Sequence, residues 1–420
     1  MKIDTKTVQG KRYQRFIYSM LAVSSFSLTV FWLYEVWRKI PSDINVKMGQ
    51  QQGLELMVPA TARIYKNKEE DRVDVDLSKE FIIYAKAEDT YTMKVNLFGV
   101  IPFKESSVSV IKDKKLVPAG EPVGIFVETD GILVIDTGAF YDIQGKKTEP
   151  AGNLLKPGDY IHKLNGKPVN NKKELMEQIA ACKGEEIILE ITREETKHTV
   201  KLRPKKNEKG EYKLGIWVRD NAQGIGTLTF IDEEGNFGAL GHGINDIDTA
   251  NLMELKEGGL YKTDIISITK GEDGSPGELT GVIAYAEKYK LGIINSNTVE
   301  GIYGTVNPTL LNQNDLLPIA LKQEVKKGKA QIISMVSGER KMYEIEIMDI
   351  HQENDNINRG MEIKVTDHEL LELTGGIVQG MSGSPIIQDG KLIGAVTHVL
   401  VNDPTRGYGI FIENMLEAAE

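Results

Sequence analysis

Cysteine is almost absent from this chain of 420 residues, in which Cys182 is the single example. A disulfide framework, a thiolate zinc cluster and a CxxC redox pair each require at least two cysteines, so none can form within one chain. The sequence also lacks an HExxH zinc motif and a GK[ST] phosphate-binding loop. We therefore expect neither a metal nor a cofactor.

Basic residues are fewer than acidic ones, with 51 Lys and Arg and 61 Asp and Glu, so the net charge is -10. Because this balance repels a polyphosphate backbone, we expect no nucleic-acid partner. Hydrophobic residues make up 40% of the chain and charged residues 27%, which excludes a disordered or multi-span membrane protein. The length predicts two or three domains at roughly 150 residues each.

One long apolar segment is present, the 19 uncharged residues 16–34. As a helix it spans about 28 Å, close to the hydrocarbon thickness of a bilayer. A cleaved signal peptide and a buried core helix are the alternatives, but the nearest small-residue cleavage pattern, at residues 60–62, is distant. Lys and Arg are more numerous before the segment than after it. We therefore expect residues 1–40 to be a cytoplasmic tail and transmembrane anchor, with the body outside the cytoplasm.

Residues 41–112 contain no recognisable chemistry. Residues 41–55 are polar and contain glutamine and glycine, which predicts a flexible tether. Short β-rich runs from residue 56 to residue 112 predict a small sheet.

Residues 113–204 have a more specific order of signals. Two strand-like runs, VGIFVE and GILVID, precede LLKPGDYIHKLNGKPV, and a helix capped by Asn171 and Glu174 follows. This order resembles a PDZ domain, which implies an α+β module that accepts an extended peptide as an added strand. By position, the resemblance places Val123, Gly124 and Ile125 in the peptide-binding loop. A degenerate module that only supports its neighbour is the alternative.

Residues 205–420 contain many short strand-like runs separated by glycines, without heptads or an alternation of strands and helices. This pattern predicts a pair of all-β barrels, and it makes the whole chain mostly β. Within it, the run GMSGSP places Ser382 on a glycine-flanked loop before an apolar hairpin. Flanking glycines let backbone N–H groups approach a reacting carbonyl, so Ser382 is a candidate nucleophile.

A serine nucleophile needs a base and an orienting acid. His242 lies between two glycines in GALGHGIND and is the leading base, with His398 as its rival. Asp367 ends an alternating strand 15 residues before Ser382, while Asp246 and Asp248 lie near His242. Spacing alone does not choose among these three acids.

The combination of GMSGSP, GALGHGIND, the PDZ-like run and one amino-terminal anchor resembles the SpoIVB peptidase family of endospore-forming bacteria. The resemblance implies a chymotrypsin-like, membrane-anchored serine protease of sporulation signalling between the two forespore membranes. It implies that the protease cleaves itself and a regulator of an intramembrane metalloprotease, at the checkpoint that activates pro-sigma-K. It assigns His242 as base, Asp367 as acid and Ser382 as nucleophile, with the N–H groups of Gly380 and Ser382 as the oxyanion hole.

Two functions therefore compete: an active serine endopeptidase, and a non-enzymatic membrane-tethered PDZ scaffold with a vestigial protease fold. The first predicts partners of three kinds, namely a protein substrate, a peptide ligand of the PDZ-like module (its own chain included) and the membrane through residues 16–34. It also predicts release of the body by self-cleavage in the tether, giving a fragment that begins between residues 41 and 62.

Overall fold

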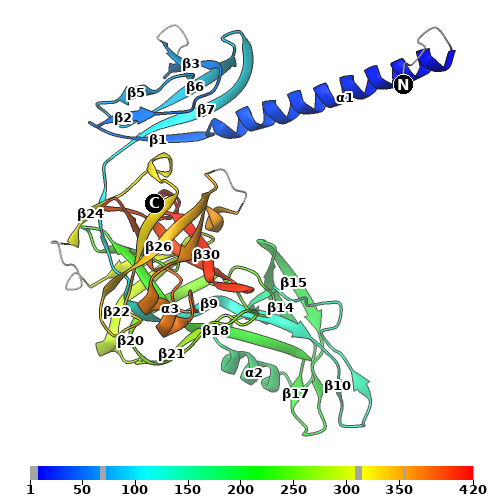
Figure 1. Ribbon diagram of the computed structural model, residues 1–420. Helices are drawn as coiled ribbons and strands as arrows, with labels where there is room; N and C mark the ends of the chain where they lie inside the picture. The colour runs from blue at the N-terminus through cyan, green and yellow to red at the C-terminus, as the bar shows by residue number, and fades with distance from the viewer. Residues whose placement is uncertain (1–7, 67–71, 308–314, 353–355, 420) are drawn as a thin grey trace. The chain divides into compact units, whose positions relative to one another are not determined.

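The computed structural model describes residues 8–66, 72–307, 315–352 and 356–419 and divides the chain into two compact units (Figure 1). The first unit runs to Asp113 and the second begins at Lys114. Strands dominate both units, which confirms the prediction of a mostly β protein.

The first unit joins one long helix to a five-stranded sheet of order β1-β7-β6-β3-β4. The helix includes a stretch, Lys11–Lys39, that is long and apolar enough to cross a membrane, with a hydropathy of 1.7. The elements are α1 (Val8–Lys39), β1 (Asp43–Lys47), β2 (Gln51–Leu54), β3 (Ala60–Tyr65), β4 (Val73–Asp76), β5 (Phe81–Tyr84), β6 (Asp89–Leu97) and β7 (Ile101–Ile111).

The predicted flexible tether over residues 41–55 is wrong, because this segment is part of the folded first unit. Strand β1 pairs in parallel with β7, and β2 pairs with β5. Ile44 and Val46 are buried in the same core as Val36 and Ile40 at the end of α1. The polar composition is misleading because apolar residues alternate with polar ones and the strand that pairs with β1 lies much later in the chain.

The second unit contains a first ring of six strands. Neighbouring strands pair in the order β9-β20-β22-β23-β19-β18, and the pairing of β18 with β9 closes the ring. Its apolar interior is a separate core cluster. The strands are β9 (Pro122–Thr137), β18 (Ile216–Ile231), β19 (Asn236–Ala239), β20 (Leu255–Thr269), β22 (Lys290–Thr298) and β23 (Gly301–Val306).

A second closed barrel of six strands follows, in the order β25-β26-β27-β30-β29-β28. The two rings together confirm the predicted pair of β-barrels. Elements of this part are β25 (Gly328–Ser334), β26 (Lys341–Ile350), β27 (Met361–Val365), α3 (His368–Thr374), β28 (Pro385–Gln388), β29 (Lys391–Leu400), β30 (Asp403–Phe411) and α4 (Ile412–Glu417).

A small α+β module is built onto the ends of β9 and β18, which continue beyond the first ring into its sheet. Its helix, α2 (Lys172–Ala181), is capped by Asn171, whose side chain accepts a hydrogen bond from the Glu174 amide as the sequence predicts. Leu175 and Ile179 face the core of the module, whereas Met176 is 52% exposed. The module's strands are β12 (Tyr160–Leu164), β14 (Ile187–Arg193) and β15 (Thr196–Leu202).

The remaining described elements are shorter strands and 3-10 turns. They are β8 (Lys115–Pro118), β10 (Phe140–Tyr141), β11 (Lys147–Thr148), β13 (Lys167–Pro168), β16 (Lys205–Lys206), β17 (Tyr212–Lys213), β21 (Glu278–Ile283), β24 (Leu317–Pro318) and three 3-10 turns, Glu287–Tyr289, Lys322–Glu324 and Ile357–Arg359.

Candidate active site

The loop that carries Ser382 lies directly before β28 and approaches the first ring closely. Gly380 and Gly383 adopt φ angles of 101° and 97°, a region that residues with a side chain rarely reach. A Cβ on Gly383 would lie 2.1 Å from the carbonyl oxygen of Thr227 in β18. The glycines therefore allow the sharp turn and the close backbone approach that the sequence predicts.

Two threonines of β18 hold the carbonyl groups of this loop. Thr227 Oγ1 donates to the Gly380 carbonyl at 2.7 Å, and the Thr227 amide donates to the Ser382 carbonyl at 3.0 Å. Thr229 Oγ1 donates to the Gly383 carbonyl at 2.8 Å. Among the described residues, the amide N–H groups of Gly380 and Ser382 have no acceptor. Two unoccupied donors beside a serine are what an oxyanion hole requires.

His242 is held in a tight bend after β19. A Cβ on Gly243 would lie 2.4 Å from the Thr298 carbonyl oxygen, so this glycine is required by a close approach. His242 Nδ1 lies 2.8 Å from the Gly243 carbonyl oxygen, which can only accept a hydrogen bond. Nδ1 therefore carries the proton, and Nε2 is left as the basic nitrogen. Burial lowers the pKa of His242, which keeps the ring neutral.

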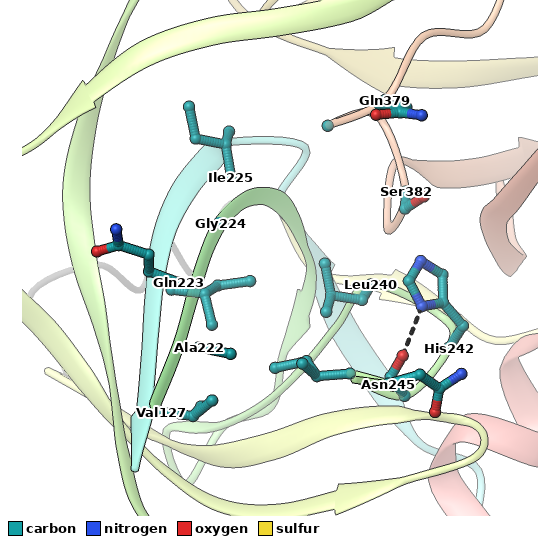
Figure 2. Close-up of a pocket in the computed structure, with 14 residues that line it drawn as sticks. Val127, Ala222, Gln223, Gly224, Ile225, Leu240, His242, Asn245, Gln379 and Ser382 are labelled. Atoms are coloured by element: carbon teal, nitrogen blue, oxygen red, sulfur yellow. Dashed lines mark hydrogen bonds between the residues drawn. The ribbon is translucent and has the colours of Figure 1, made fainter. Parts of the chain in front are cut away.

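Ser382 and His242 line the same pocket, and the imidazole edge opposite the Gly243 hydrogen bond is turned toward the serine (Figure 2). The serine hydroxyl does not donate to the histidine. It donates instead to the Thr397 carbonyl at 2.6 Å. A rotation of the Ser382 side chain away from Thr397 is therefore needed before His242 can accept its proton.

His398, the rival base, is a neighbour of His242. The two ring centroids lie 5.0 Å apart. Loss of hydration, followed by the effects of His242 and of the Arg359 guanidinium, lowers the pKa of His398 to about 4. His398 is not among the residues that line the pocket with Ser382, so the geometry favours His242 as the base.

None of the three candidate acids is paired with His242. Asp367 caps α3, accepting the Leu370 amide at 3.0 Å and the Glu344 amide at 3.2 Å. Asp246 and Asp248 both pair with Arg219. Among the described residues, His242 has no carboxylate partner. The family resemblance assigned Asp367 as the acid, but a carboxylate directly before a helix also suits a helix cap.

Val123, Gly124 and Ile125 do not form a peptide-binding loop, which corrects the expectation from the PDZ resemblance. They lie within β9, which pairs with β18 on one side and with β20 on the other. These three residues therefore have described strand partners on both sides and offer no edge to an added strand. The two predicted strands VGIFVE and GILVID are consecutive parts of this one long strand, so its first half belongs to the barrel.

A mostly apolar pocket of about 310 Å³ opens beside Ser382 and His242. Sequence reasoning missed its walls, although the glycines of AQGIG in β18 are a signal for close backbone approach. A neighbouring pocket of about 490 Å³ shares Gln379 and Gly380 with it and extends along β21. The first pocket is lined by Ile125, Val127, Ala222, Gln223, Gly224, Ile225, Leu240, His242, Gly243, Ile244, Asn245, Gln379, Gly380 and Ser382.

Comparison with known proteins places part of the chain in a family. Residues 210–416 match the family described as SpoIVB peptidase S55, which confirms the resemblance over that range. The Rv3671c protease in its inactive form is 14% identical, over 46% of this chain and 84% of that chain, with a TM-score of 0.27. A quinonprotein alcohol dehydrogenase-like protein from Bacteroides thetaiotaomicron is 11% identical over 78% of each chain, with a TM-score of 0.11.

Proposed function

We propose, from the membership of residues 210–416 in the SpoIVB family of sporulation serine peptidases, that the chain is a membrane-anchored signalling endopeptidase. As the resemblance implies, it cleaves a regulator of an intramembrane metalloprotease, at the checkpoint for pro-sigma-K activation, and also itself. One observation supports catalysis above all: Ser382, the neutral base His242 and two unoccupied amide donors surround one pocket.

The proposed mechanism begins with rotation of the Ser382 hydroxyl from Thr397 to His242 Nε2. Nε2 takes the proton as Oγ attacks the scissile carbonyl, and the Gly380 and Ser382 amides stabilise the oxyanion. His242 then gives the proton to the leaving amine, and a water releases the acyl group by the same route. The Gly243 carbonyl holds the imidazole in the required tautomer, the task an acid performs in other serine proteases.

The apolar pocket supports a preference for substrates with an aliphatic side chain next to the scissile bond. The pocket is lined by the base His242 and by the loop that carries the oxyanion donors. The leaving amine takes its proton from the base, so this side of the nucleophile is the side from which the amine departs. We therefore assign it to the residue that follows the scissile bond. Digestion of a peptide library, with products sequenced by mass spectrometry, should show aliphatic residues enriched there. Enrichment only before the scissile bond would reject this assignment.

The α+β module offers an alternative place for an extended peptide. Residues 216–219 of β18 pair only with β9 among the described strands, and α2 packs beside them. This free edge supports binding of a peptide as an added strand. Because β18 continues into the pocket wall, a peptide held there is close in the chain to the catalytic loop.

A non-enzymatic scaffold is the second candidate, and the hydrogen bond from Ser382 to Thr397 favours it. A vestigial site would keep this bond permanently and hydrolyse nothing. Peptide hydrolysis by the full-length chain, with Ser382→Ala as the control, separates the two functions. Equal hydrolysis by the wild type and by the Ser382→Ala variant would support the scaffold.

A further inference from the structure

The turn between β6 and β7 in the first unit exposes a group of apolar side chains. Phe98 is 62% exposed, Val100 is 78% exposed and Ile101 is 52% exposed. Turns that face water usually carry glycine, asparagine, aspartate or serine. Three exposed large apolar residues within four positions of the chain therefore suggest contact with a nonaqueous surface.

Phe98 also has an unfavourable backbone conformation. Its φ is 53°, in the left-handed region that bulky residues seldom occupy, and Gly99 follows with a φ of 78°. An asparagine would fit this position with less strain. The phenyl ring stays largely exposed despite this cost, so most of its surface is open to a partner outside the folded unit.

The turn lies beside the helix that is proposed to cross the membrane. The rings of Phe98 and Trp32 of α1 are stacked, with centroids 6.0 Å apart and planes inclined by 11°. Trp32 is two residues before Tyr34, the last residue of the uncharged segment. Val36 and Ile40 are buried in the core of the sheet, so the end of α1 and the turn are fixed to each other (Figure 1).

Basic side chains lie near the end of α1, one to two helical turns after Trp32. Lys104 Nζ is 4.1 Å from the centre of the Trp37 ring. The Arg38 side chain is 61% exposed, and Lys39 ends the helix. A sequence of apolar tip, aromatic rings and basic side chains is the order met on passing from lipid hydrocarbon through the interface to the phosphate groups.

We propose that the β6–β7 turn inserts into the outer leaflet beside α1 and serves as a second membrane contact of the first unit. The inference rests on the proposed membrane anchor. Phe98 and Val100 would then lie at the edge of the hydrocarbon, and Lys104 and Arg38 at the level of the lipid phosphates. Two contacts, one helix and one turn, fix the orientation of this unit on the membrane.

The test measures the depth of single labelled positions in the full-length chain. All variants carry Ser382→Ala, which prevents the proposed self-cleavage, and Cys182→Ala, which removes the native thiol. Val23→Cys in α1, Val100→Cys in the turn and Val73→Cys on β4 are each labelled with a polarity-sensitive fluorophore. The proteins are reconstituted in phosphatidylethanolamine and phosphatidylglycerol vesicles containing spin-labelled lipid. Val73 is a matched control because it is an exposed valine, at 63%, on another strand of the same sheet.

We expect lipid quenching at Val23 and Val100 to exceed that at Val73 by about threefold or more, as for a residue within the interface. Quenching at Val23 but not at Val100 would overturn the turn's insertion while leaving the anchor intact. Absence of quenching at Val23 would overturn the anchor, and the inference with it.

Discussion

At the scale of single residues, the group that orients His242 is a backbone carbonyl, whereas Asp367 accepts backbone amides elsewhere. His242 is aligned by its neighbour's carbonyl oxygen, 2.8 Å from Nδ1. A backbone acceptor fixes the tautomer as a carboxylate does, but it adds no negative charge to stabilise an imidazolium. The pKa of His242 is accordingly lowered by burial and not raised by an acid.

Substitution of Asp367 distinguishes a cap from a catalytic acid. Asparagine also caps helices, whereas alanine does not, and loss of a cap costs about 1 kcal/mol. We expect Asp367→Asn to retain the wild-type kcat and to lose little stability, because its one acceptor oxygen keeps the Leu370 cap while its NH2 group cannot accept the Glu344 amide. We expect Asp367→Ala to unfold at a lower denaturant concentration. Urea unfolding and peptide hydrolysis measure the two effects. A large fall in kcat for a stable Asp367→Asn variant would restore the acid role that the family resemblance assigns.

The pH dependence of hydrolysis follows from the state of His242. The base works only when it is neutral, and its pKa lies below the ordinary value of 6.5. The acid limb of kcat/KM should therefore have its midpoint below 6.5, so activity persists into mildly acidic buffer. His398→Asn should retain an acid limb below 6.5, because the proposed base is His242. A midpoint above 6.5 would indicate an acidic partner that the described contacts do not include.

The site residues differ in how well the sequence alone could identify them. Ser382 and His242 were selected because flanking glycines indicate close backbone approach, and the structure shows that approach at Gly383 and Gly243. The partners of Asp367 could not be predicted, because a strand end followed by a helix places many carboxylates in similar sequence surroundings. Only the fold determines that its oxygens face the amides of Leu370 and Glu344.

At the scale of elements, strand β18 connects several parts of the second unit. Its first residues belong to the module, residues 222–225 form a pocket wall, and Thr227 and Thr229 hold the nucleophile loop. The sequence did not reveal this continuity, because glycines at 224 and 226 resemble breaks between short strands.

Gly224 gives a direct test of the pocket. A Cβ there would meet no atom within 4 Å and its φ is not in the left-handed region, so a side chain is tolerated. We expect Gly224→Phe to fill the pocket and raise KM for substrates with a large aliphatic residue after the scissile bond by about tenfold or more. Gly224→Ala is the matched control and should change KM little. An unchanged KM in Gly224→Phe would mean that this pocket binds no substrate side chain.

At the scale of the whole molecule, the two compact units are joined at Asp113 and Lys114. We propose this junction, in place of residues 41–55, as the position of self-cleavage. Residues 112–115 are exposed, and residues 112–114 lie in neither a helix nor a strand, whereas residues 43–47 are paired and largely buried. An extended segment enters a protease cleft with little unfolding, so the junction is the more accessible site.

Self-cleavage should therefore produce a soluble fragment that begins near residue 114. The full-length chain should accumulate in Ser382→Ala membranes, while the active chain yields the fragment. Amino-terminal sequencing identifies the cleaved bond. A fragment that begins between residues 41 and 62 would mean that β1 or β2 opens before cleavage, and the same fragment from Ser382→Ala would assign the cut to another protease.

The measurement that tests the central claim most directly is covalent labelling of the full-length chain by a fluorophosphonate, followed by mass spectrometry of its peptides. The probe reacts with a serine activated by a neighbouring base. Ser384 is the natural control, because it lies two residues away, is fully buried and has no hydroxyl hydrogen-bond partner in the part of the chain that the structure describes. We predict one label per chain on Ser382, lost in Ser382→Ala and in His242→Ala and kept in Ser384→Ala. An unlabelled wild type, or a label on Ser384, would contradict the account.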